Sequence, residues 1–290
     1  MNMKISRITR DKIVDYLLHR KEKFYGDLGL LEFLDEVFDL NSIPSLYDHR
    51  FESASGEIWQ HMINNHDWDD EYLLKEYLKI SACDDEKFIL FVETCLHADV
   101  CVDEKIMMER FFRIRKILKN DKYDLIIESI KSNLPTIKVK KINDGEQWKY
   151  DVALSFASEQ REYVGKVAEF LKQKGVDVFY DKFEEVGLWG EDLSERFARV
   201  YGGEESDYCV VFISKEYAKK AWTKFEFRHA LANFIKKRGD FILPARFDDT
   251  EIESLPPTIC FFDLRGKTPD EFGEIILRKL FEMIKRKSEG

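Results

Sequence analysis

Residues 221–227 read AWTKFEF and place one carboxylate, Glu226, between two phenylalanines and four residues after Trp222. On a helix, a spacing of four puts Glu226 and Trp222 on the same face. A carboxylate beside aromatic side chains that exclude water can stabilise a positive charge that develops during a reaction. The alternative is a surface glutamate next to a core tryptophan, which is the commoner arrangement because acidic side chains are mostly exposed. The seven residues by themselves favour the second interpretation.

Composition excludes several classes of protein. The chain has 290 residues, of which 44% are hydrophobic, and this content supports sizeable folded cores. A net charge of −10 disfavours binding to phosphate-rich surfaces, so nucleic acid and anionic membranes are unlikely partners. The positive charges in residues 111–120 are better explained as a solvated helix face than as a nucleic-acid site. The sequence contains no apolar stretch long enough to span a membrane.

The cysteines and the absent motifs narrow the chemistry further. The five cysteines form no CxxC pair and no regular framework, which is typical of reduced thiols and predicts a cytoplasmic protein. The motifs GxxxxGK[ST], GxGxxG, HExxH and GxSxG are all absent. His61 and His66 are five residues apart, off the spacing of four that would aim two metal ligands from one helix face. We therefore expect no metal and no bound cofactor.

The pattern of apolar and polar residues changes in the segment 131–150, which contains a proline, a basic run and an Asn-Asp-Gly turn signal. Before it, apolar residues recur with helical period, which predicts a mostly helical domain over residues 1–140. After it, strand-like runs alternate with amphipathic segments, which predicts parallel βαβ units over residues 148–290. The expected helices and strands are, in order, 30–40, 71–80, 87–96, 104–118, 150–156, 161–175, 176–181, 208–214, 215–237, 241–247 and 259–264, followed by a closing helix.

The second half resembles a bacterial TIR domain over residues 148–286. The stretches that carry the resemblance are YDVALSFASEQREYV, VFYDKFEEVGLWGEDL, CVVFISKEYAKKAWTKFEFRHAL and FILPARFDDTEI, in the family's order. The resemblance implies an α/β fold, a flavodoxin-like five-stranded parallel sheet. Many such domains cleave NAD⁺ at the nicotinamide–ribose bond with a glutamate in the motif S-x-x-Y-x-x-S-x-W-C-x-x-E-L. Ser214, Tyr217, Trp222 and Glu226 match this motif, while Thr223 and Phe227 replace its cysteine and leucine.

The resemblance implies a set of site residues. Glu226 is the expected catalytic residue, because its carboxylate would stabilise the oxocarbenium character that forms as nicotinamide leaves. The expected substrate-binding residues are Ser155, Phe156, Asp181, Trp189, Tyr217 and Trp222. Ser155 and Phe156 end the first predicted strand, although core packing explains Phe156 equally well. Trp189 lies between two glycines in a loop that resembles the one through which TIR domains join their neighbours.

The first half resembles an N-terminal domain of the abortive-infection proteins of the AbiJ type. The resemblance covers roughly residues 5–100 and is clearest over 26–68. It implies an all-α module that senses a signal or holds protomers together. Pro44, Asp48 and Arg50 suggest a buried ion pair that fixes a turn rather than a reactive pair, since no nucleophile–base arrangement accompanies them.

Taken together, the two resemblances imply an antiphage abortive-infection effector. Its TIR domain would be an NAD⁺ hydrolase, with NAD⁺ as substrate, activated by self-association into a homo-oligomer and by an unknown phage-derived or cellular trigger. The alternative is a non-enzymatic scaffold whose TIR domain only binds other TIR domains. Glu226 beside Trp222 favours the enzyme, because an adaptor needs no carboxylate at that position.

Overall fold

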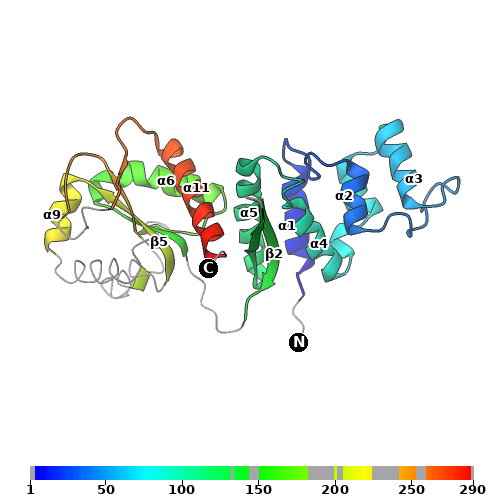
Figure 1. Cartoon of the computed structure of the whole chain (residues 1–290), viewed down its shortest axis with the longest axis horizontal. Helices are drawn as coiled ribbons and strands as arrows, with labels where there is room; N and C mark the ends of the chain where they lie inside the picture. The colour runs from blue at the N-terminus through cyan, green and yellow to red at the C-terminus, as the bar shows by residue number, and fades with distance from the viewer. Residues whose placement is uncertain are drawn as a thin grey trace. The chain divides into compact units, whose positions relative to one another are not determined.

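The computed structural model describes residues 4–131, 134–143, 150–181, 199–200, 205–223, 242–252 and 259–288. Its contacts divide the chain into two compact units (Figure 1). Unit 1 contains Met1–Asn143 together with Phe281–Gly290, and unit 2 contains Asp144–Leu280. Each unit has its own core.

Unit 2 is built on a five-stranded parallel sheet in the order β4-β3-β5-β6-β7. Its strands are β3 (Tyr150–Ser155), β4 (Val178–Phe179), β5 (Ser206–Ile213), β6 (Ile242–Arg246) and β7 (Phe262–Asp263). This order is that of flavodoxin-like folds, in which the first strand lies between the second and the third. The predicted fold class of this half is confirmed.

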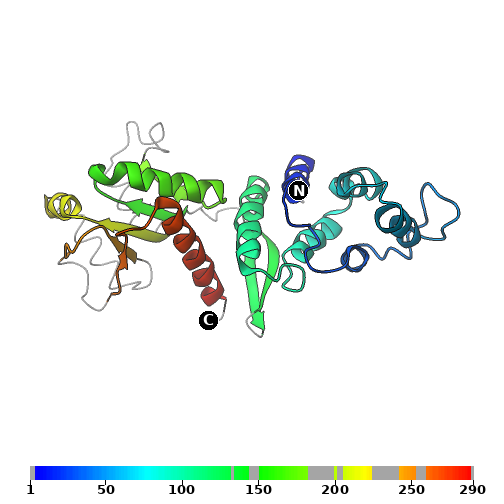
Figure 2. The ribbon, with the colours of Figure 1, turned by 90° about the horizontal axis from the view of Figure 1, so that it is seen from above.

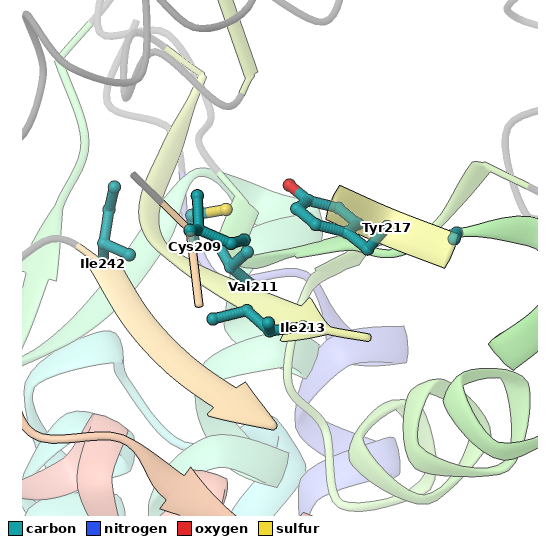
Figure 3. Close-up of a cluster of buried hydrophobic side chains, with 7 residues drawn as sticks. Cys209, Val211, Ile213, Tyr217 and Ile242 are labelled. Carbon is teal, nitrogen blue, oxygen red and sulfur yellow. The ribbon is translucent and has the colours of Figure 1, made fainter. Parts of the chain in front are cut away.

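The central strands form because their residues are apolar on both faces. Val152, Ala153 and Leu154 of β3 are fully buried, as a parallel sheet covered by helices on both sides requires. On β5, Cys209, Val211 and Ile213 share one face and pack with Ile242 of β6 (Figure 3). Alternate residues of a strand point to the same face, so this cluster is one layer of the core.

Two helices lie against each other on the sheet, α6 (Arg161–Gln173) and α11 (Pro269–Lys287), and α11 belongs to unit 2 as far as Leu280. They approach closely because Gly273 of α11 faces the ring of Phe170, where an added Cβ would come within 2.4 Å of a ring carbon. Figure 1 and Figure 2 both show the two helices close together. Helix α6 stops where Gly175 adopts φ +95°, a conformation that glycine reaches without strain.

Unit 1 is mostly helical, as expected. Its elements are α1 (Arg7–Leu18), α2 (Leu30–Val37), α3 (Ala54–Ile58), α4 (Asp85–Cys95) and α5 (Glu104–Leu118), with two π-helical segments, η1 (Trp59–Asn64) and η2 (Tyr72–Tyr77), and short 3₁₀ turns. Three phenylalanines meet edge to face in its core, because the ring of Phe33 lies 5.3 Å from that of Phe24 and 5.9 Å from that of Phe91. Such pairs add directional contacts to apolar burial.

A β-hairpin in unit 1 corrects the all-α expectation for this region. Strands β1 (Tyr123–Lys131) and β2 (Leu134–Lys141) pair antiparallel, and the hairpin contacts α5 and α4 (Figure 2). Leu125, Ile127 and Ile137 are buried, while the basic residues of β2 alternate with apolar ones. The basic run in 131–150 therefore belongs to a strand, and its charge concealed the period of two.

Candidate active site

The carboxyl edge of the unit 2 sheet contains the point at which the chain reverses its direction of winding. Strand β3 is flanked by β4 on one side and β5 on the other, and Ser155 at the end of β3 pairs with Val211 of β5. Open α/β sheets bind their ligands in the crevice at this reversal point. The expected site residues that the structure describes come from segments that end at this edge.

Ser155 and Tyr217 are joined across the reversal point. Their hydroxyl oxygens are 2.9 Å apart, and both side chains are only 5% exposed. Burial raises the pKa of the Tyr217 hydroxyl far above its usual range, with a smaller opposing effect of Ser155. Tyr217 therefore stays neutral and acts as a hydrogen-bonding partner of Ser155 rather than as a base. In Figure 3 its ring lies against the β5 layer.

The start of helix α9 (Lys215–Thr223) is fixed at the same edge. The hydroxyl of Ser214 accepts a hydrogen bond from the amide of Tyr217 at 3.1 Å, which makes Ser214 the N-cap. The carboxylate of Asp248, from the loop after β6, accepts one from the amide of Lys215 at 3.2 Å. A carboxylate at a helix N-terminus also interacts favourably with the positive end of the helix dipole. Ser214, the first serine of the sequence motif, thus has a structural role as the cap of this helix.

A second group of side chains lies where β4 ends. The guanidinium of Arg161, the first residue of α6, donates two hydrogen bonds of 2.7 Å to the two carboxylate oxygens of Asp181. The same guanidinium lies 5.2 Å from the centre of the Phe156 ring, and that ring stacks on Tyr180 at 5.5 Å. The bond to Asp181 raises the pKa of Arg161 further above its usual range, so the guanidinium is charged at any physiological pH.

The structure thus joins Ser155 directly to Tyr217, while Phe156 and Asp181 are connected through Arg161. Phe156 is half-buried, which suits a pocket wall better than a core position. Trp222 is part of α9, whereas Trp189 and Glu226 lie outside the described residues. The roles assigned to these side chains stay predictions.

Arg161 is the member of this group that the sequence did not reveal. One feature of the sequence could have indicated its role. A positive side chain in the first turn of a helix interacts unfavourably with the helix dipole, and a nearby acidic side chain would compensate for this. The sequence did not show which acidic residue would pair with Arg161, since Asp181 is 20 positions away along the chain.

Unit 1 corrects the interpretation of the Pro44–Arg50 turn. Arg50 does pair with Asp48, but its side chain is 78% exposed, so the ion pair is not buried. The turn is fixed instead by Glu57, which is fully buried. Burial by itself would raise the pKa of Glu57, but hydrogen bonds from Tyr77, Ser45 and backbone amides outweigh it and hold that pKa below its usual value.

The carboxylate of Glu57 accepts five hydrogen bonds. Three come from the consecutive amides of Leu46, Tyr47 and Asp48 at 2.9, 3.0 and 2.9 Å. The other two come from the hydroxyls of Ser45 and Tyr77, at 2.8 and 2.6 Å. We call this arrangement the Glu57 cage. It satisfies a buried charge with neutral donors and makes the loop a fixed part of the fold.

Two further properties concern the described residues as a whole. Among them, no group of three or more histidine, cysteine, aspartate or glutamate side chains is placed to hold a metal ion. No helix in the described ranges is long and apolar enough to cross a membrane.

Comparison with known proteins agrees with this architecture. Residues 152–277 match the family model of the TIR domain, and residues 4–139 match that of AbiJ N-terminal domain 3. The chain therefore carries a TIR domain behind an AbiJ N-terminal domain, and both resemblances drawn from the sequence are confirmed.

Three curated relatives are similar to part of the chain. The chain is 47% identical over 133 residues to the 3′ cyclic ADP-D-ribose synthase AaTIR of Aquimarina amphilecti, covering 46% of this chain and 40% of that protein. It is 32% identical over 185 residues to the probable 2′ cyclic ADP-D-ribose synthase TcpO of Methanobrevibacter olleyae, covering 61% and 49%. It is 33% identical over 123 residues to the NAD(+) hydrolase TirS of Staphylococcus aureus, covering 41% and 42%. The chain thus spans less than half the length of each relative.

Proposed function

We propose that the TIR domain is an enzyme that breaks the nicotinamide–ribose bond of NAD⁺. The observation that carries the proposal is the match of residues 152–277 to the TIR family model, together with the similarity of the chain to one cyclic ADP-D-ribose synthase, one probable cyclic ADP-D-ribose synthase and one NAD(+) hydrolase. Hydrolysis and cyclisation share their first step, in which the C1′–N bond breaks and nicotinamide leaves with the bonding electrons. They differ in whether water or a hydroxyl of the same molecule then attacks C1′ and releases a proton.

In this proposal Glu226 is the catalytic carboxylate. Its negative charge stabilises the ribosyl cation that forms as neutral nicotinamide departs. The Ser155–Tyr217 pair and the Phe156 wall support the proposal, because they lie at the sheet edge where flavodoxin-like folds bind nucleotides. Asp181, Trp189 and Trp222 are the other proposed substrate contacts. The higher identity to the synthase of Aquimarina amphilecti favours capture by a hydroxyl of the same molecule.

The experiment is NAD⁺ turnover by the full chain and by Glu226→Gln. Glutamine keeps the shape of the side chain but removes its charge, a loss on the order of a hundredfold or more in rate. Glu169→Gln, an exposed position on α6, is the matched control and should keep wild-type turnover. Chromatography of the products distinguishes ADP-ribose from a cyclic form. Near wild-type turnover by Glu226→Gln would refute the catalytic assignment and favour the scaffold.

We further propose a biological setting for this activity. An AbiJ N-terminal domain joined to a TIR domain supports a role in antiphage abortive infection, in which NAD⁺ depletion stops an infected cell. Self-association through TIR domains, a homo-oligomer, a phage-derived or cellular trigger and a cytoplasmic location belong to the same proposal. This proposal predicts that bacteria expressing the chain lose NAD⁺ and yield fewer phage. Glu226→Gln should restore both the NAD⁺ level and the phage yield.

A further inference from the structure

Unit 1 contains a pocket that the proposed function does not use. It has a volume of about 710 Å³ and lies among the end of α1, the loop before α2 and the segment 62–71. Pockets that hold small molecules have volumes of roughly 300 to 1,000 Å³. All its lining residues belong to unit 1, so the pocket is complete within the AbiJ N-terminal domain.

The apolar part of the pocket includes aromatic side chains with defined contacts. Its lining includes Leu18, Leu30, Met62, Ile63, Tyr25 and Trp68. The Trp68 indole stacks on the His61 ring at 4.4 Å with planes 7° apart, and the His61 ring is held by Asp67 at 2.9 Å. The Trp68 ring also contacts Tyr72 at 4.9 Å and Tyr77 at 4.8 Å, so its ring contacts are with residues outside the lining.

The backbone around the pocket departs from regular structure at three places. The π-helical segment η1 contributes Met62 and Ile63 to the lining, and the π-helical segment η2 begins directly after Glu71. His66, between them, has φ +56°, a conformation that costs energy for any residue with a side chain. Irregular helices and strained residues persist where the surrounding structure holds them, and they gather at functional sites.

Two histidines in the lining are oriented by backbone carbonyls. Nδ1 of His19 lies 2.7 Å from the carbonyl oxygen of Asp15, and Nδ1 of His66 lies 3.0 Å from that of Met62. A carbonyl only accepts, so each Nδ1 carries a proton and donates it, and in this tautomer of the imidazole Nε2 is the acceptor. Within the described part of the chain, neither Nε2 makes a hydrogen bond.

One carboxylate in the lining has no ion-pair partner among the described residues. Lys23 pairs with Asp70 at 2.9 Å, and Lys75 is shared between Glu71 at 2.7 Å and Asp15 at 2.8 Å. Asp69 uses one oxygen to accept the amide of Tyr72 at 2.7 Å, and among the described residues it has no cationic partner. The lining therefore has three carboxylates, Asp69, Asp70 and Glu71, against the single lysine Lys23, and it presents hydrogen-bond acceptors beside an apolar wall.

We propose that this pocket binds a small organic cation, with an ammonium or guanidinium group directed to Asp69 and the histidine Nε2 atoms and an apolar body against Met62 and Ile63. A bare divalent metal fits less well, because the described residues contain no group of three metal-ligating side chains. The AbiJ N-terminal domain is then a ligand-binding module.

The test uses three probes that share a phenyl body and differ in charge, namely 2-phenylethylammonium, 2-phenylethanol and phenylacetate. Their binding to the full chain is measured by calorimetry and ligand-detected NMR. The cation should bind at least about threefold more tightly than the alcohol, as expected for one partly exposed ion pair, and phenylacetate should bind least. Equal affinities for the three probes, or tighter binding of the anion, would overturn the proposal.

Variants connect the binding to this pocket. Asp69→Asn should weaken the cation about threefold and leave the alcohol unchanged, because asparagine keeps the oxygen that accepts the Tyr72 amide. Asp11→Asn, an exposed position on α1 outside the lining, should change nothing. Ile63→Arg should abolish binding of both the cation and the alcohol, and its fold is checked by circular dichroism, since Ile63 is already 42% exposed. Unchanged cation binding by Asp69→Asn and Ile63→Arg would also overturn the proposal.

Discussion

Arg161 is a single side chain that organises much of one side of the candidate site. It is the first residue of α6, where a positive charge is unfavourable to the helix by about 0.3–1 kcal/mol at exposed positions. Asp181 offsets this cost because its carboxylate accepts two hydrogen bonds from the guanidinium. The same guanidinium lies over the Phe156 ring. We infer that Arg161 positions Phe156 and Asp181, two of the proposed substrate contacts.

Replacing Arg161 should therefore affect turnover more than stability. Arg161→Ala should lower kcat/KM for NAD⁺ about tenfold, equivalent to about 1.4 kcal/mol, and Arg161→Lys should recover only part of it because lysine cannot form the paired bonds. Lys166→Ala is the matched control, since Lys166 forms an exposed ion pair with Glu162 on the same helix. A fall in melting temperature with unchanged kcat/KM would show that the pair serves only the fold.

The loop of residues 45–48 has no regular structure of its own, and the Glu57 cage holds it in place. Its three consecutive amides point at one carboxylate on α3, so the loop and the helix support each other. Because the donors are neutral and the site is buried, a missing acceptor would leave amides without partners. Leu46 and Tyr47 are therefore exposed on a rigid loop rather than a loose one.

Glu57→Gln should destabilise unit 1 by about 2–3 kcal/mol, because the amide has one acceptor oxygen where five donors converge. The folded-state pKa of Glu57 is lowered from its ordinary value of 4.5, so its contribution is fully present above pH 4.5 and is lost as the pH falls through the lower folded-state pKa. Urea unfolding at pH 7 and at pH 3 measures this, with exposed Glu52→Gln as control. A stability difference that does not shrink at pH 3 would contradict the cage.

For the chain as a whole, assembly is the property that would connect its two halves. A module that holds protomers together raises the effective concentration of their TIR domains. The proposed activation by self-association therefore predicts that NAD⁺ turnover per protomer rises with protein concentration. Light scattering and turnover measured over the same concentration series test this, and a flat activity across a change in mass would argue against it.

Trp189→Ala should shift that dependence. An interface tryptophan contributes about 2 kcal/mol or more, so the concentration for half-maximal turnover should rise roughly 30-fold, while the melting temperature changes little. Trp59→Ala, at a 46% exposed tryptophan of unit 1, is the control and should leave the dependence unchanged. A large drop in melting temperature for Trp189→Ala would instead identify Trp189 as a core residue.

Elements with a strong period were predictable from the sequence. The window 104–118 coincides with α5 (Glu104–Leu118), and the apolar runs at 150–156 and 208–214 became β3 and β5. These segments bury a face whose residues recur every two or every 3.6 positions, and this recurrence is visible in the sequence. The hairpin of β1 and β2 was missed because the lysines of β2 hid the alternation.

The sequence by itself determined the alternation of strands and helices, the family motif around Glu226, and the residues that end the strands at one sheet edge. Only the tertiary structure decided which side chains meet there. Arg161 finds Asp181 20 positions away, Tyr217 finds Ser155 62 positions away, and Glu57 gathers donors from a loop and from η2. These partners are selected by the packing of whole elements, which brings distant segments together. No local period records that packing, so the sequence could supply the candidates but not their pairing.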